Sequence, residues 1–463
     1  MTHFDTALSF HAQHDFENAL LHYDLALREN PADFQILSNR GAALQKLRRF
    51  DQALQSYDQA LQLTQAHAAI YNNRGVTLKD LHRLDPALES FDQALQLNPT
   101  YVEALVNRGF VHHLQNALTL AQADYERAIV LDPSFAAAHF NLSLTQLAQG
   151  NYAQGWPNYE WRWDAVPSMP RRVFEQGQPL WLGQADVRGQ TLLLFAEQGL
   201  GDSLQFCRYV AQVKALGARV ILQVPRELHG VLSGLAGVDA LIDLHQSPAH
   251  FDWQCPLMSL PLAFGTTLDN IPCASSYLLA DADKAQHWKK RLAAFRRPRI
   301  GCVWSGGFRP DQPELWTLNT RRNLPLNHLQ SFRNIDADFF SLQKGEPAQS
   351  DWATAQQQGW TGPMLHNFVH ELHDFSDTAA LIANLDLVIS VDTSTAHLAA
   401  AMGKPTWILN RFDACWRWLS DRSDSPWYDS VKLYRQSTDG DWSSVMSLVT
   451  ADLLRFVDNA PST

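Results

Sequence analysis

A 34-residue repeat occupies the first third of the chain and constrains the fold more than any other feature of the sequence. Gly41, Gly75 and Gly109 stand 34 residues apart, each at the end of an Asn-Arg-Gly tripeptide. Alanine, aromatic and proline positions keep the same step: Ala19, Ala53, Ala87 and Ala121; Tyr23, Tyr57, Phe91 and Tyr125; Ala26, Ala60, Ala94 and Ala128; Pro31, Pro99 and Pro133. A period of this length is typical of stacked units that bury a core only together.

Each period is predicted to form two amphipathic helices, with small residues where the helices approach and a proline where the second helix ends. The pattern resembles the tetratricopeptide repeat, and the first unit carries Ala7 in place of the glycine, as expected of a terminal repeat. The resemblance implies a concave face that holds a peptide or protein. An array that only stabilises a dimer is the alternative.

A fifth unit begins near Ala136 and then departs from the pattern, with Trp156, Trp161 and Trp163 close together. Three tryptophans present too much apolar area to remain in water, so we expect them to pack the array against the following domain. A capping helix with its own small core is the alternative.

The composition limits the class of protein. The 463 residues are 46% hydrophobic and 18% charged, which allows several cores and excludes global disorder. A net charge of −11 argues against a protein that binds nucleic acids or anionic membranes in general, because such binding needs a basic surface. Five scattered cysteines form no metal-ligand spacing, and no signal peptide or apolar run of about 20 residues is visible. We therefore expect a cytoplasmic chain without a membrane span.

The remainder alternates predicted strands and helices. Apolar runs at 191–196, 219–224 and 238–244 predict one parallel sheet, and runs at 299–304, 338–342, 385–391 and 405–409 predict a second. The expected fold class is α + α/β, a helical solenoid followed by two Rossmann-like lobes. The expected domains are the solenoid at 1–165, a linker at 166–190, the lobes at 191–290 and 291–440, and a final helix at 441–463 that crosses back to the first lobe.

The strongest local signal is the turn after the strand at 385–391. It reads Asp392-Thr393-Ser394-Thr395-Ala-His397 and opens a predicted helix. A helix N-terminus with three hydroxyl groups favours phosphate binding. Ordinary capping by one hydroxyl is the alternative, as is a structural role for His397.

A second signal follows the first strand of the first lobe, where Gln198-Gly-Leu-Gly-Asp202 starts a helix. A dinucleotide-binding turn is disfavoured because Leu204 stands where the third glycine would be. Two doubly wound sheets in tandem are expected to leave a cleft between them that faces the carboxyl ends of their strands. The turn places Asp202 at the mouth of this cleft, where it is either a helix cap or a general base. Arg309, Arg321, Arg322, Lys344 and Glu346 come from loops expected at the same cleft, and guanidinium groups bind phosphate well.

The two turns, about 190 residues apart and in this order, resemble the landmarks of inverting GT-B glycosyltransferases of the heptosyltransferase-like family. The likeness covers roughly residues 190–436, and Ser394 replaces the usual glycine of that family. The layout of repeats before a two-lobed transferase also looks like O-GlcNAc transferases and bacterial protein glycosyltransferases, including those that modify flagellin.

The resemblance implies a role for each candidate residue. Asp202 would take the acceptor proton, and a donor-side loop would contain Trp427, with Gln198 and Glu346 near the nucleoside. The diphosphate of the donor would contact two groups of residues: Thr393, Ser394, Thr395 and His397, oriented by Asp392; and Arg309, Arg321, Arg322 and Lys344. A helix N-terminus and arginines can stabilise a diphosphate, so no metal is required. The Asp-x-Asp pairs at 281–283 and 336–338 are expected to be surface residues.

The predicted function is therefore the inverting transfer of a sugar from a nucleotide-sugar co-substrate, without a bound cofactor, to a hydroxyl of a protein recruited by the repeats. One alternative is a scaffold with a degenerate transferase lobe, suggested by Ser394. Another is a transferase that acts on lipopolysaccharide or another glycan.

Overall fold

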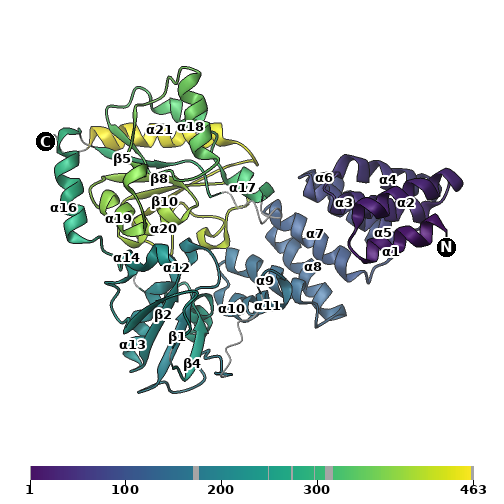
Figure 1. The fold of residues 1–463 in the computed structure, drawn as a ribbon, viewed down its shortest axis with the longest axis horizontal. Helices are drawn as coiled ribbons and strands as arrows, with labels where there is room; N and C mark the ends of the chain where they lie inside the picture. The colour runs from purple at the N-terminus through teal and green to yellow at the C-terminus, as the bar shows by residue number, and fades with distance from the viewer. Residues whose placement is uncertain are drawn as a thin grey trace. The chain divides into compact units, whose positions relative to one another are not determined.

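The computed structural model describes residues 2–169, 177–248, 250–272, 275–296, 298–307 and 316–459. The chain divides into two compact units. The first comprises Met1–Thr145 with Asp164–Val166, and the second comprises Gln146–Trp163 with Pro167–Thr463. The first is helical and the second contains two parallel sheets, as the sequence predicts (Figure 1).

The first unit is built from helix pairs of nearly constant length. The helices are α1 (His3–Ala12), α2 (Phe16–Glu29), α3 (Phe34–Lys46), α4 (Phe50–Leu63), α5 (Ala68–Asp80), α6 (Leu84–Leu97), α7 (Val102–Leu114), α8 (Leu118–Leu131) and α9 (Ala136–Ala148). The repeated glycines allow the two helices of a pair to approach closely. A Cβ atom at Gly75 would lie 2.6 Å from the Phe91 ring, and one at Gly109 would lie 2.8 Å from Tyr125. Larger residues there would force the helices apart.

The turn inside each helix pair has a left-handed residue that recurs with the 34-residue step. His14, Arg48, His82 and Asn116 have φ values of 60°, 58°, 58° and 57°, and Gly150 follows at 79°. The residue types differ, so the sequence pattern alone does not reveal this conformation. Shared backbone geometry thus continues the repeat as far as residue 150.

Arginines of the Asn-Arg-Gly tripeptides tie successive repeats together. Arg40 on α3 donates to Asp24 of the preceding repeat at 2.7 Å and to Ser56 of its own repeat at 2.6 Å. Arg74 makes the equivalent bonds one repeat later. The first helices also contact one another directly, α3 with α5 and α5 with α7, so they form the inner side of the array.

The first sheet of the second unit has the strand order β3-β2-β1-β4, and all its strands are parallel. The strands are β1 (Thr191–Phe195), β2 (Arg219–Val224), β3 (Ala240–Asp243) and β4 (Trp253–Pro256). The predicted runs correspond to β1, β2 and β3, whereas β4 was not predicted. The expected helix after the first turn is α12 (Leu200–Phe206), which continues through a 3-10 turn into α13 (Val210–Ala215).

The second sheet has the order β10-β9-β8-β5-β6-β7, again wholly parallel. Its strands are β5 (Arg299–Val303), β6 (Asp338–Ser341), β7 (Leu365–Asn367), β8 (Leu387–Val391), β9 (Thr406–Asn410) and β10 (Val431–Arg435). The chain builds outward from β5 in one direction and from β8 in the other. The loops after β5 and β8 therefore meet at a switch point, where ligands of such sheets bind.

Helices on the second sheet are α17 (Trp316–Arg322), α18 (Ala348–Gln357), α19 (Phe375–Ala383), α20 (Ser394–Ala401) and α21 (Trp442–Asp458), with α16 (Ala282–Arg291) packed on α19. The sequence predicts that the final helix crosses back to the first lobe, but the buried face of α21 packs on the second sheet instead. Val445, Val449 and Leu453 of α21 are fully buried in the core of the second sheet. Their spacing of four residues puts this apolar stripe on one side of the helix.

Trp156 belongs to the second unit and packs inside it. It lies on α10 (Tyr152–Tyr159), which leads to α11 (Arg162–Ala165). Its indole N–H donates to the carbonyl of Thr266 at 3.0 Å, and its ring packs edge-on against Trp416 at 5.3 Å. Trp156 therefore packs on residues that follow it in the chain and is not part of a capping helix with its own core, while docking of the repeats through this segment stays a prediction.

Two further expectations concern the described part of the chain. No helix in the described ranges is long and apolar enough to cross a membrane. Cys207, Cys255 and Cys302 are buried, as expected, and together with Cys415 they are free thiols.

Candidate active site

The two motif turns lie in direct contact. The contact is formed by the first residues of α12 and α20. A Cβ atom at Gly201 would lie 2.9 Å from Cδ2 of His397 and 3.4 Å from Cα of Ser394. We expected the turns to face each other across a cleft. The absence of a side chain at Gly201 instead lets the two helix starts touch.

Replacing Gly201 by Ala is expected to separate the two turns and to lower any activity that needs both. The new Cβ needs a shift of the His397 ring, which is held on its other faces by packing. Gly234→Ala is the matched control, because nothing lies within 4 Å of a Cβ there. Unfolding followed by tryptophan fluorescence reports the second unit, since all 15 tryptophans lie at or after residue 156. Equal stability and equal ligand affinity in the two variants would contradict the close contact.

Asp202 is held at the start of α12 by two partners. Its Oδ2 accepts the backbone N–H of Gly199 at 2.8 Å, and its Oδ1 forms an ion pair with Arg417. The side chain is 22% exposed. A carboxylate has about four lone-pair sites, so two remain for a further donor. Asp202 is therefore both a helix cap and a carboxylate that is open to solvent.

Arg417 is a site residue that sequence reasoning missed. It lies in the Trp-Arg-Trp run after β9, in the connection to β10 that also contains Trp427. The guanidinium is 8% exposed and also donates to Gln205 at 2.8 Å. Only the fold shows that this arginine, 215 residues from Asp202, reaches across to the first lobe.

The turn before α20 divides its hydroxyl groups between two tasks. Thr393 caps the helix, because its Oγ1 accepts the N–H of Ala396 at 3.3 Å and shares a hydrogen bond with Ser390 at 2.9 Å. Ser394 and Thr395 are partly exposed. Their hydroxyls have no hydrogen-bond partner within the described part of the chain. Two hydroxyls, rather than the expected three, are thus available to a ligand at this helix start.

His397 is buried and supports the turn from behind. Its Nδ1 lies 2.9 Å from the Tyr428 hydroxyl, and its ring stacks on Trp418 with centroids 5.3 Å apart. Nε2 is 3.7 Å from Oδ1 of Asp392, which is 21% exposed. Burial lowers the pKa of His397 to about 4, so the imidazole is neutral near pH 7. It therefore brings no positive charge to an anion at neutral pH.

The expected arginines differ in what they can offer a ligand. Arg321 is paired with Asp413 and lies 3.3 Å from Asp439. Arg322 donates to Asn319 at 2.8 Å, and its guanidinium lies against Gly306 in the loop after β5. Arg309 falls outside the described residues. Of the two described arginines, Arg322 is the one beside the switch point.

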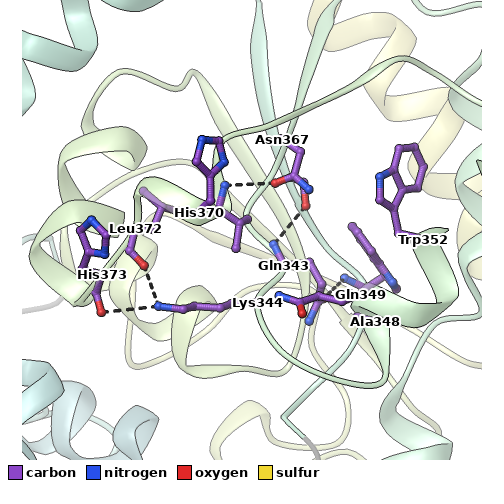
Figure 2. A pocket seen from close by; sticks show the side chains of 12 residues that line it. Gln343, Lys344, Ala348, Gln349, Trp352, Asn367, His370, Leu372 and His373 are labelled. Carbon is purple, nitrogen blue, oxygen red and sulfur yellow. Dashed lines mark hydrogen bonds between the residues drawn. The ribbon is translucent and has the colours of Figure 1, made fainter.

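A cavity of about 480 Å³ opens at the carboxyl ends of β5, β6 and β7 (Figure 2). Its wall includes two tryptophans, Trp304 and Trp352, and the amides of Gln343, Gln349 and Asn367. Trp304 is 2% exposed, and its buried indole N–H has no hydrogen-bond acceptor among the described residues. A buried donor without a partner is costly, so a ligand with an acceptor oxygen would be stabilised here.

Lys344 lines this cavity, whereas Glu346 does not, and the expected contact of Lys344 with the donor diphosphate stays a prediction. The Lys344 ammonium donates to the carbonyl of Leu372 at 2.6 Å (Figure 2). Glu346 is exposed and accepts the N–H of Ser350 at 3.2 Å. Its part in nucleoside binding has no support in the walls of the cavity.

The two remaining candidates bond to the segment at 146–163. Gln198 donates to the Tyr159 hydroxyl at 2.8 Å. Trp427 is fully buried, and its indole N–H donates to the Tyr152 hydroxyl at 2.9 Å. Trp427 therefore packs the interior, and its side chain presents no surface to a donor.

The Asp-x-Asp pairs take structural roles. Asp281 caps α16, and Asp336 forms an ion pair with the exposed Arg296. Across the described residues, no group of three or more His, Cys, Asp or Glu is arranged to hold a metal ion.

Behind the first turn lies a buried charged cluster that sequence reasoning also missed. Glu197 lies two residues after the end of β1 and is 4% exposed, and its Oε1 lies 3.2 Å from the fully buried Arg162. Arg162 also pairs with Glu160 at 2.7 Å, so one cation faces two carboxyl groups. Burial raises the pKa of Glu197 to about 7.

Glu197→Gln is expected to reduce the pH dependence of stability. A folded-state pKa near 7, above the usual 4.5, means that the folded chain holds more protons than the unfolded chain between these values. The free energy of unfolding contributed by Glu197 therefore falls as the pH rises from about 4.5 to 7, by up to about 3 kcal/mol. Urea unfolding at pH 5 and pH 8 should show a smaller loss for Glu197→Gln than for wild type. Parallel losses in both proteins would refute the raised pKa.

Sequence comparisons agree with the two-part organisation. Tetratricopeptide-repeat models match residues 34–64, 68–101 and 115–155. The glycosyltransferase family 9 (heptosyltransferase) model matches residues 372–409, which include α20 and its turn. The chain is 27% identical over 334 residues to protein FlbA of Caulobacter vibrioides, covering 67% of this chain and 54% of that protein. The chain thus spans about half the length of this curated relative.

Solved structures similar to part of the chain include PilW, a type IV pilus biogenesis factor, with 27% identity and a TM-score of 0.33. That match covers 35% of this chain and 76% of PilW. A tetratricopeptide-repeat protein of Thermus thermophilus has 22% identity and a TM-score of 0.32, covering 36% of this chain and 90% of its own. From the family matches, the chain combines tetratricopeptide repeats with a segment similar to glycosyltransferase family 9.

Proposed function

We propose that the protein is a glycosyltransferase that moves a sugar from a nucleotide-sugar donor to a hydroxyl group of a protein recruited by the repeats. The observation that carries this proposal is the contact between the turn of Asp202 and the helix start at Ser394. This contact places the solvent-accessible carboxylate of Asp202 next to a helix start that can bind an anionic leaving group.

Two neighbouring places in the second lobe would bind the two halves of the donor. The diphosphate would bind the N–H groups and free hydroxyls at Ser394 and Thr395, with Arg322 near the same switch point. The nucleoside would enter the neighbouring cavity, where Trp304 offers an N–H group and Trp352 an aromatic surface. The helix start and the cavity lie at the carboxyl ends of adjacent strands, β8 and β5.

The proposed reaction is a single displacement at the anomeric carbon. An acceptor hydroxyl attacks as Asp202 takes its proton, and the bond from the anomeric carbon to the diphosphate oxygen breaks. The leaving electrons remain on the diphosphate, whose charge the start of α20 stabilises. Attack from the face opposite the leaving group inverts the configuration. Every group with a proposed role here is a side chain or backbone N–H of the chain.

The repeats offer a regular polar surface for a protein acceptor. Asn39, Asn73, Asn107 and Asn141 recur every 34 residues on the first helices and are partly exposed. Amide groups can pair with the N–H and C=O groups of an extended peptide. Because the first helices form the inner side of the array, these amides support a peptide-binding role.

The double variant Asn73→Ala, Asn107→Ala is expected to lose transfer to protein while the chain still turns over its donor. The assay offers nucleotide sugars and a substrate protein, and intact mass reports the added sugar. Release of nucleoside diphosphate into water, without an acceptor, reports the transferase unit. Gln59→Ala, Gln93→Ala is the matched control, since these exposed residues have the same spacing on the second helices. Transfer at the wild-type rate by the asparagine variant would exclude acceptor binding at these amides. Failure of every donor to react with wild type would favour a scaffold.

A further inference from the structure

The turn from Glu197 to Asp202 is fixed by side chains that come from several parts of the chain. Glu197 is paired with Arg162, Gln198 is bonded to Tyr159, and Asp202 is paired with Arg417. Two of these three partners belong to the short segment α10–α11 that precedes the sheets. This segment therefore holds the two residues that lead from β1 into the turn.

Arg162 is buried in the first lobe and is hydrogen-bonded there. It is fully buried and donates to Ser259, after β4, at 2.7 Å and to Glu160 at 2.7 Å. Its guanidinium stacks on the rings of Tyr159 and Trp163 at 5.0 and 4.3 Å. Both terminal nitrogens of the guanidinium are hydrogen-bonded, whereas Nε of Arg162 and Oε2 of Glu197 are buried without a partner among the described residues. Breaking a buried ion pair is costly, so Arg162 fixes the position of Glu197 through its contact with Oε1.

Tyr159 joins the turn to the second lobe as well. It is 3% exposed, and its ring packs against Trp416, with centroids 6.3 Å apart. Trp416 adjoins Arg417, the partner of Asp202. A displacement of Tyr159 would consequently act on the turn from two sides, through Gln198 and through the loop of Arg417.

We propose that Tyr159 and Arg162, which lie outside both sheets, are positioning residues for Asp202. The inference rests on the proposed transferase function and extends it to a segment between the repeats and the lobes. The side chains act through Gln198 and Glu197, and neither needs to touch the donor or the acceptor. Their effect should fall on the rate of the chemical step, because small displacements of a catalytic group reduce rate strongly.

Tyr159→Phe tests the proposal in the full chain, because it removes only the hydroxyl that holds Gln198. We expect kcat for donor turnover to fall by about tenfold, with the KM for donor changed less than about twofold. Tyr209→Phe is the matched control. It removes another buried hydroxyl of the same lobe, one that lies 2.8 Å from Thr266 and away from the turn. The control should keep the wild-type kcat.

A double-mutant cycle with Gln198→Ala separates positioning from general destabilisation. If Tyr159 acts through Gln198, the double variant should be no slower than the slower single variant. Arg162→Met should also lower kcat, and Arg162→Lys should restore part of it. Wild-type kcat in Tyr159→Phe, or fully additive losses in the cycle, would overturn the proposal while the transferase function stands. A wild-type chain that turns over no donor would overturn both.

Discussion

Replacing Asp202 by Asn is expected to lower the rate of sugar transfer by about 10²–10⁴-fold, the range typical of losing a general base. The amide cannot accept the proton of the acceptor hydroxyl at neutral pH. The oxygen of the amide can still accept a hydrogen bond from Arg417, and this bond can hold the turn in its position. Affinity for a nucleoside diphosphate should stay near that of wild type, because the proposed phosphate contacts lie on α20.

The rate is measured as release of nucleoside diphosphate, and affinity is measured by isothermal titration. Asp269→Asn is the matched control, since this carboxylate is exposed and outside the site. Unfolding should be compared for all three proteins, because Asp202 also caps α12 through Gly199. Transfer by Asp202→Asn at the wild-type rate would remove Asp202 as the base.

Replacing Trp156 by Ala is expected to lower the free energy of unfolding of the second unit by about 3–5 kcal/mol. The side chain is 2% exposed and packs against Phe206, Trp416 and Trp427. Its removal also leaves the carbonyl of Thr266 without this N–H donor. Few single substitutions in this unit should cost more.

Denaturant unfolding followed by tryptophan fluorescence measures this loss, and the repeats are silent because they contain no tryptophan before residue 156. Leu448→Ala, at a residue that is 59% exposed, is the control and should change stability by less than about 0.5 kcal/mol. A loss of less than about 1 kcal/mol for Trp156→Ala would mean that the segment at 146–163 does not hold the unit together.

The sequence predicts those parts of the fold that produce a pattern among residues close together in the chain. The repeat shows in residue types every 34 positions, and the strands buried on both faces show as apolar runs. Strand β4, Trp-Gln-Cys-Pro, and strand β10, Val-Lys-Leu-Tyr-Arg, mix polar with apolar residues and so give no continuous apolar run. Their place in the sheets depends on neighbours far along the chain.

The site shows the same division between local and long-range information. The glycine turn and the hydroxyl-rich helix start are visible as motifs, and the structure brings them together. Arg417, Tyr159 and Arg162 carry no motif, because their partners are 215, 39 and 35 residues away. The sequence does not reveal the burial of Trp427 either, because a loop aromatic residue that packs in the core cannot be distinguished by sequence from one that contacts a ligand.

The most direct test of the central claim is a crystal structure of the full chain with a nucleoside diphosphate, taken in turn from UDP, GDP and ADP. We expect the diphosphate to contact Ser394 and Thr395 at the start of α20. We also expect the nucleoside to lie in the cavity beside Trp304, with Asp202 facing the terminal phosphate. A nucleotide bound elsewhere on the chain, or no binding at millimolar concentrations, would contradict it.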